Sequence, residues 1–182
     1  MKVLGICGSP QEGNTKRLLT WILDSCRARD AQTEIIKISD FDIKFCNGCG
    51  VCYGSERPCV INDDMEQLLS KMLEVDAIVF GSPNYFDNVT GLMKNFIDRT
   101  NPLSDPQLLK GKATAIVCVG ARAIEETKVV VQILEKYCEV MGVLPVGSVI
   151  AQAEDPGDVD RQEDTKLACI DLGNNIMDKL VG

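Results

Sequence analysis

The chain contains no histidine among its 182 residues. This absence excludes Ser-His-Asp and Cys-His catalysis, a histidine general acid or base, and zinc or haem sites that depend on imidazole ligands. Basic residues are also few, since 19 Lys and Arg stand against 27 Asp and Glu and the net charge is −8. Nucleic acid and anionic membrane surfaces bind clustered Lys and Arg, so neither is expected as a partner.

Long apolar runs are missing as well. No run of about eighteen apolar residues could span a membrane, and no charged-then-apolar leader begins the chain, so a cytoplasmic location is predicted. The nine cysteines are an odd number, which argues against a disulfide framework and favours free thiols or metal ligands. The length predicts one domain, residues 1–182.

Strand and helix patterns alternate along the whole chain. Apolar segments predict strands at 3–7, 33–38, 76–81, 112–120 and 143–151, and helical spacing begins at residues 15, 65, 92 and 129. A solvated loop is expected at 153–165, before a closing helix that runs to residue 180. Asp63 with Glu66 is expected to cap the second helix, and Thr90 the third. The pattern predicts an α/β fold with a parallel sheet between two helix layers, in the flavodoxin-like order 2-1-3-4-5.

Ligands of such sheets bind beyond the C-terminal ends of the first and third strands. The loop after the first strand has Gly8 and Gly13 at the spacing of a nucleoside-triphosphate loop, but Asn14 occupies the lysine position. Hydroxyls and amides at a helix N-terminus suit one terminal phosphate instead, although an ordinary strand–turn–helix connection explains the same pattern. The candidate phosphate-binding residues are Ser9, Gln11, Gly13, Asn14, Thr15 and Lys16.

The loop after the third strand begins Pro83-Asn84-Tyr85-Phe86. A flat ring needs an apolar or aromatic wall and backbone hydrogen-bond partners, and this loop supplies both. Together with the phosphate loop it predicts a flavin-mononucleotide site. The alternative is that the two aromatic residues only cap the core.

The strongest signal is Cys46-x2-Cys49-x2-Cys52-x6-Cys59. Four thiolates on a loop with glycines at 48, 50 and 54 can bind the corners of one iron–sulfur cluster. Zinc usually joins two separated C-x2-C pairs, and the spacing before the fourth cysteine is short for that, but zinc and unligated thiols remain alternatives. The remaining cysteines are expected to be small buried hydrophobes: Cys7, Cys26, Cys118, Cys138 and Cys169.

Three segments together resemble the iron–sulfur flavoproteins, a branch of the NAD(P)H-dependent FMN reductases: GSPQEGNT, the CNGCGVC...C segment running into INDDM, and GSPNYFDNVTGLMKNFIDR. The resemblance implies FMN, with its phosphate at Ser9, Gln11, Asn14, Thr15 and Lys16 and its ring along Pro83, Asn84, Tyr85 and Phe86. It also implies a 4Fe-4S cluster on Cys46, Cys49, Cys52 and Cys59. Gly120, in the segment where relatives often carry a glycine-rich loop, is the remaining candidate at the ring.

The favoured interpretation is a redox protein that passes electrons between a 4Fe-4S cluster and FMN, with no catalytic acid or base assigned. The alternatives are an NAD(P)H-dependent FMN or quinone reductase without a cluster, and a non-enzymatic flavodoxin-like carrier. The electron donor or acceptor is expected to be a ferredoxin-like protein or a small molecule such as NAD(P)H. A homodimer or homotetramer is also expected, because the cysteine loop 46–59 and the flavin loops are predicted at one edge, where another copy could cover them.

Overall fold

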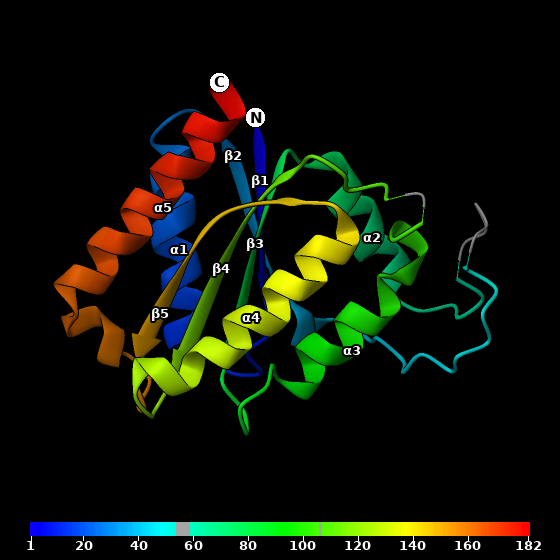
Figure 1. The fold of residues 1–182 in the computed structure, drawn as a ribbon, viewed down its shortest axis with the longest axis horizontal. Coiled ribbons are helices and arrows are strands. Elements are labelled where there is room, and N and C mark those ends of the chain that lie inside the picture. Colours follow the sequence, from blue (N-terminus) through cyan, green and yellow to red (C-terminus); the bar gives the residue numbers. More distant parts are fainter. Residues whose placement is uncertain (54–58, 106) are drawn as a thin grey trace.

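The computed structural model describes residues 1–53, 59–105 and 107–182. Five parallel strands form one sheet in the order β2-β1-β3-β4-β5 (Figure 1). The strands are β1 (Lys2–Cys7), β2 (Gln32–Lys37), β3 (Ala77–Pro83), β4 (Ala113–Gly120) and β5 (Leu144–Gln152). The expected flavodoxin-like fold, its strand order and its single domain are confirmed.

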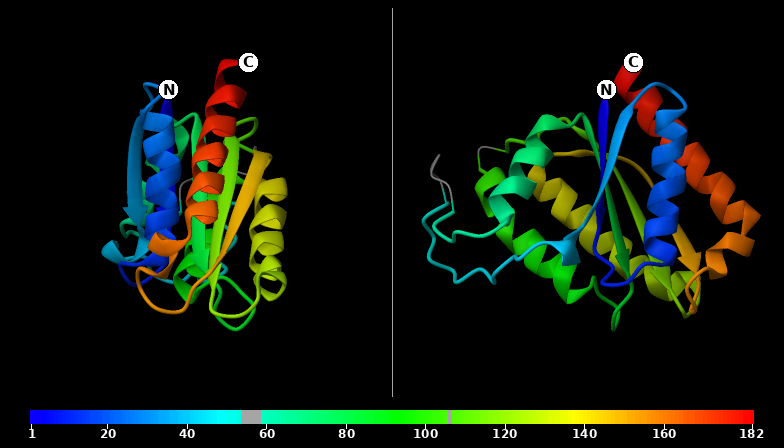
Figure 2. Two further views of the ribbon diagram at one scale, coloured as in Figure 1. Left: turned by 90° about the vertical axis from the view of Figure 1, so that its left-hand side faces the viewer. Right: turned by 180° about the vertical axis from the view of Figure 1, so that it is seen from behind.

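Helices cover both faces of the sheet (Figures 1 and 2). One face carries α1 (Asn14–Arg27) and α5 (Glu163–Val181), and the other carries α2 (Met65–Glu74), α3 (Gly91–Arg99) and α4 (Ile124–Met141). Strand side chains alternate between the two faces, so that Leu4 and Ile6 pack beneath α2–α4 while Val3 packs beneath α1 and α5. Every residue of β4 is buried, as a strand covered on both faces requires. None of the described helices is long and apolar enough to cross a bilayer.

Three short 3-10 turns complete the described structure: η1 (Ile38–Asp40), η2 (Asn101–Leu103) and η3 (Asp158–Arg161). The last of them lies in the segment predicted to be a solvated loop, and its Val159 is fully buried. α4 also begins at Ile124, before the expected residue 129. The apolar stripe that predicted this helix marks only its buried face, whereas its first turn carries Glu125 and Glu126, which the helix dipole favours.

The expectation that Asp63 caps α2 is confirmed in part. Asp64, the residue before Met65, has helical backbone angles and makes no side-chain capping bond, and the side chain of Asp63 takes that role. Asp63 does accept the N–H of Met65 at 3.0 Å, but its two oxygens also bind the buried side chain of Arg99. A long-range partner therefore decides where this carboxylate lies.

The loop after β1 is fixed against the start of α3. Thr90 caps α3 as expected, because its Oγ1 accepts the N–H of Met93 at 3.1 Å, and the same hydroxyl donates to the backbone oxygen of Gly8 at 2.6 Å. A Cβ at Gly8 would lie 2.9 Å from that of Met93, so only glycine fits at this crossing. Two segments distant in sequence are thus held together at the C-terminal edge of the sheet.

Candidate functional site

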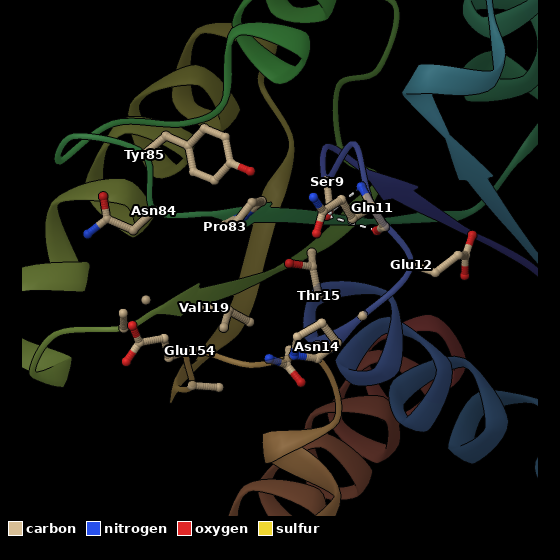
Figure 3. Close-up of a pocket in the computed structure, with 15 residues that line it drawn as sticks. Ser9, Gln11, Glu12, Asn14, Thr15, Pro83, Asn84, Tyr85, Val119 and Glu154 are labelled. Atoms are coloured by element: carbon tan, nitrogen blue, oxygen red, sulfur yellow. Dashed lines mark hydrogen bonds between the residues drawn. The ribbon is translucent and has the colours of Figure 1, made fainter.

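A cleft of about 200 Å³ opens at the edge where β1, β3, β4 and β5 end (Figure 3). Most of the predicted flavin-binding residues line it: Ser9, Gln11, Gly13, Asn14, Thr15, Pro83, Asn84, Tyr85 and Gly120. Six further residues, which no sequence pattern singled out, line it too: Glu12, Val119, Ala121, Ala153, Glu154 and Pro156. Lys16 and Phe86 do not line this cleft.

The N-terminus of α1 faces the cleft without a cap. Gly13 is its N-cap residue and has no side chain to cap the helix, and the first turn contains no acidic residue. The unpaired N–H groups and the positive end of the helix dipole suit an anion. Lys16 instead pairs with Glu12 at 2.7 Å, and this hydrogen bond is the main cause of the lowered pKa of Glu12.

Asn14 uses its side chain to hold the loop that follows β5. Its Nδ2 donates to the backbone oxygen of Asp155 at 2.9 Å, and its Oδ1 accepts the N–H of Gly157 at 2.9 Å. This amide therefore positions the wall formed by Ala153 and Glu154. The sequence could have predicted this wall, because the loop follows the C-terminal end of β5, and the strands of a parallel sheet end at the same edge.

The hydroxyl side chains of Ser9 and Thr15 line the cleft on the loop and the first turn of α1. Ser9 Oγ donates to the backbone oxygen of Gln11 at 3.0 Å and accepts its N–H at 3.3 Å, which makes a compact turn. Thr15 is almost fully buried yet borders the cleft, and its hydroxyl points into it in Figure 3. The hydroxyl of Thr15 is in place to donate to an anion held by the loop, whereas Ser9 would first have to turn its hydrogen away from Gln11.

The loop after β3 forms one aromatic wall of the cleft. Tyr85 and Asn88 exchange backbone hydrogen bonds of 3.0 and 3.2 Å, and the two residues between them, Phe86 and Asp87, have φ angles of 52° and 58°. This tight turn leaves Tyr85 on the cleft and Phe86 fully exposed at the tip. The Oδ1 of Asn84 is buried with no partner among the described residues, so a hydrogen-bond donor on a ligand would satisfy it.

The four cysteines of the motif line a second cavity of about 660 Å³. Gly48 and Gly50 have φ angles of 67° and 72°, which turn the loop sharply, whereas Gly54 and Pro58 lie outside the described residues. The opposite wall is mainly apolar and is formed by Ile61, Ile97, Ile133, Tyr137, Val140 and Met141. Within the described ranges, no three Cys, Asp or Glu side chains are grouped closely enough to hold one metal ion.

Two of these sulfurs have side-chain N–H donors. Asn101 Nδ2 lies 3.1 Å from Cys52 Sγ, and Arg99 Nη2 lies 3.7 Å from Cys59 Sγ. Arg99 forms a buried ion pair with Asp63, whose side chain is 0% exposed. Burial raises the pKa of Asp63, but the hydrogen bonds from Arg99 and from two backbone N–H groups outweigh it, and the net pKa is lowered. The donor set thus suits sulfur that carries negative charge.

The other five cysteines are buried in the sheet or beneath helices. Burial raises the pKa of Cys118 and Cys169 to about 12 and that of Cys26 and Cys138 to about 11, and it also raises the pKa of Cys7. Metals bind thiolates, so these protonated thiols are packing residues.

Residues 1–155 match the NADPH-dependent FMN reductase family. The chain belongs to this family. An iron–sulfur flavoprotein of Archaeoglobus fulgidus is 36% identical over 179 residues, which cover 97% of the chain and 79% of that protein. An iron–sulfur flavoprotein of Methanocaldococcus jannaschii is 36% identical over 148 residues, 81% of the chain and 76% of that protein. The predicted membership of the iron–sulfur flavoprotein branch is therefore confirmed.

Solved structures agree with this assignment at the level of the fold. The NAD(P)H:quinone oxidoreductase from Methanothermobacter marburgensis superposes with a TM-score of 0.73 over 97% of both chains, at 16% sequence identity. The family includes flavin-dependent oxidoreductases. As a member of this family, the chain is a flavin redox protein.

In this FMN reductase family member, the cysteine cavity and the cleft do not share an edge, contrary to the sequence-based expectation. The cleft includes Ala121, just before α4, whereas the cysteine cavity includes Tyr137 and Met141 at the other end of that helix. A helix rises ~1.5 Å per residue, so the distance from Ile124 to Tyr137 is about 20 Å. The loop that follows β2 turns away from the strand ends and runs past α3 (Figure 1).

Proposed function

We propose that the cleft binds FMN. The phosphate would lie at the uncapped N-terminus of α1, within reach of the hydroxyls of Ser9 and Thr15, and the ring would lie against Pro83 and Tyr85. Asn84 lines the cleft beside them, and its buried Oδ1 has no partner among the described residues. The first-turn N–H groups and hydroxyls provide for one terminal phosphate, which favours FMN over a dinucleotide.

We also propose a 4Fe-4S cluster on Cys46, Cys49, Cys52 and Cys59. The observation that carries this proposal is that all four side chains line one cavity, where two of the sulfurs already have N–H donors. The relatives named iron–sulfur flavoproteins support the presence of an iron–sulfur cluster. The loop glycines allow the thiols to turn toward a common centre.

The proposed function is electron transfer between the cluster and FMN. When both are bound, the flavin exchanges electrons in pairs and the cluster exchanges them singly, so together they link the two kinds of transfer. The chain contributes binding, orientation and electrostatics. Tyr85 is half exposed beside the cleft, which leaves one side open to a donor or acceptor such as NAD(P)H or a ferredoxin-like protein.

We propose further that the working form is a homodimer or homotetramer. The two sites lie toward opposite ends of α4, where Ile124 and Ile133 are separated by roughly 14 Å of helical rise. Electron transfer slows steeply with distance. Several large side chains are also exposed near the two sites, including Phe86 beside the cleft and Phe45 and Tyr53 on the cysteine loop. A second copy that covers them could bring its cleft toward the cysteine cavity of the first copy.

A cluster-free FMN or quinone reductase is the second candidate. It is favoured by the finding that, in the parts of the chain that the structure describes, no three acidic or thiol side chains could hold one metal ion. Within this candidate, the same finding favours free thiols over zinc ligands for the four cysteines. The cleft and its proposed FMN would be unchanged.

Anaerobic purification followed by assay of iron, acid-labile sulfide, zinc and flavin distinguishes these candidates. The proposal predicts equal iron and sulfide with one cluster per FMN, and broad visible absorbance beneath the flavin bands. Flavin with zinc, or flavin with neither metal, would support the reductase instead. Light scattering on the same sample tests the oligomer, which a monomer at micromolar concentration would contradict.

A further inference from the structure

Arg99 holds both ends of the cysteine loop at one point. Its Nη1 donates to the backbone oxygen of Lys44 at 2.6 Å and to Asp63 at 2.5 Å, and its Nη2 donates to Asp63 at 3.0 Å. Lys44 precedes the first motif cysteine, and Asp63 follows the last. One guanidinium at the end of α3 therefore closes the loop that carries all four thiols.

Asp63 completes this closure from the other side. Its Oδ2 also accepts the N–H of Lys44 at 2.9 Å, and its Oδ1 accepts the N–H of Met65. The paired side chains are 1% and 0% exposed. Because the carboxylate neutralises the guanidinium, the pair presents directed N–H dipoles to its surroundings with little net charge. The Nε of Arg99 is buried and has no partner among the described residues, so the guanidinium has a donor left for a ligand.

Asn101 supplies a second donor from the same short segment. Its Nδ2 lies 3.1 Å from Cys52 Sγ, and its Oδ1 accepts the hydroxyl of Ser104 at 3.3 Å. The same hydroxyl lies nearer the backbone oxygen of Asn101, at 2.7 Å, so its one hydrogen is shared between two oxygens of that residue. Arg99 and Asn101 thus direct N–H groups at two of the four motif cysteines, Cys59 and Cys52.

We propose that Arg99, Asp63 and Asn101 are positioning residues for the iron–sulfur site, which hold the Cys52 and Cys59 sulfurs and raise the reduction potential of the cluster. This inference rests on the proposed cluster. Hydrogen bonds to sulfur stabilise the more electron-rich reduced state over the oxidised state, and partners beyond the ligands tune a metal site in this way. Removing these donors should therefore shift the midpoint potential to more negative values.

The test is an EPR-monitored redox titration of anaerobically reconstituted protein. Asn101→Asp keeps the shape of the side chain but replaces the donor with an anion, and Asn101→Ala removes the donor without adding charge. Both should retain FMN, iron and sulfide and shift the cluster potential negatively, with the larger shift in Asn101→Asp. Arg99→Lys, which keeps the charge but loses the planar fork, should shift it in the same direction.

The matched control is Asn174→Asp. It makes the same charge change on α5, across the sheet from the cysteine cavity, and its Oδ1 still accepts the Ser25 hydroxyl. Its potential should equal that of the wild type. Equal potentials in the wild type and in all variants of Asn101 and Arg99 would overturn this inference alone, as would an equal shift in Asn174→Asp. Wild-type protein that takes up no iron and sulfide would overturn the proposed cluster as well, so the two failures are distinct.

Discussion

Asn14 and Asp155 are joined by a hydrogen bond of 2.9 Å across 141 positions of the sequence. The amide of Asn14 thus ties the start of α1 to the loop after β5, and the two together make one corner of the cleft. The side chain contributes to the site by shaping it. The N–H groups of the first helical turn remain for the anion.

Asn14→Asp tests the anion site. The carboxylate still accepts the N–H of Gly157, and a negative charge in the first turn favours the helix, but it can no longer donate to the backbone oxygen of Asp155, so the apo protein should lose ~1–2 kcal/mol of stability and remain folded. The same charge lies beside the proposed phosphate. Two like charges 4 Å apart near a protein surface repel by ~4 kcal/mol, so FMN affinity should fall at least about tenfold. Fluorescence titration with FMN measures this, and an unchanged affinity would contradict the phosphate site.

Ser9→Ala with Thr15→Ala removes both hydroxyls at the helix end. A neutral hydrogen bond is worth about 1 kcal/mol and one to a charged group about 1.5–3 kcal/mol, so the double variant should lose roughly a hundredfold in FMN affinity. Riboflavin, which lacks the phosphate, is the matched control ligand and should bind both proteins equally. A parallel loss of riboflavin binding would show that the hydroxyls support the loop and not the phosphate.

Gly120 and Thr127 are too close for any side chain at residue 120. A Cβ there would lie 2.2 Å from Thr127 Oγ1, a hydroxyl that is buried without a partner in the part of the chain that the structure describes. Gly120→Ala should cost ~1–3 kcal/mol in the free energy of unfolding, as overpacking does. Adding Thr127→Ala should recover part of this loss. Gly91→Ala is the control, because its Cβ would meet nothing within 4 Å. Urea unfolding compares the wild type, Gly120→Ala, Thr127→Ala, the double variant and Gly91→Ala, and additive costs in the double variant would contradict the clash.

The order of the strands and the two candidate sites follow from local patterns. A parallel sheet in this order brings the loops after β1 and β3 to the same edge. The sequence therefore predicts that Thr15 and Tyr85 line one cleft, as they do. The course of the cysteine loop could not be predicted. It depends on the ion pair between Asp63 and Arg99, whose members are 36 positions apart. The sequence pattern around Asp63 predicts a helix cap. No nearby residue in the sequence indicates that this carboxylate pairs with an arginine.

Asp63→Asn leaves the buried charge of Arg99 without its partner. Removing one member of a buried pair costs ~3–5 kcal/mol, so the apo variant should unfold at a much lower urea concentration at pH 7. The folded-state pKa of Asp63 is lowered, so its contribution is present above the unfolded pKa of about 3.9 and is lost as the pH falls through the folded value. The stability gap between wild type and variant should therefore close in acid.

The control for this pair is Asp178→Asn. Asp178 also binds an arginine, Arg29 at 2.7 Å, but its side chain is 67% exposed. Exposed pairs contribute 0–1 kcal/mol, so this variant should match the wild type within that range at every pH. If the gap for Asp63→Asn stays constant down to pH 3, the charge of Asp63 is not what stabilises the fold.

Cys59→Ala tests whether the four motif cysteines act as one ligand set. In a 4Fe-4S cluster each thiolate binds a different iron, so one Cys→Ala change leaves an iron without its ligand and should make the cluster labile to oxygen. Iron, sulfide and broad visible absorbance should be largely lost, while FMN is retained, because the cleft is a separate site at the other end of α4.

Cys138→Ala is the matched control. That thiol is fully buried 3.9 Å from Thr114 Oγ1, so its loss should cost about 1 kcal/mol of packing and leave both cofactors in place. Full iron and sulfide in Cys59→Ala would exclude this residue as a ligand and favour the cluster-free reductase.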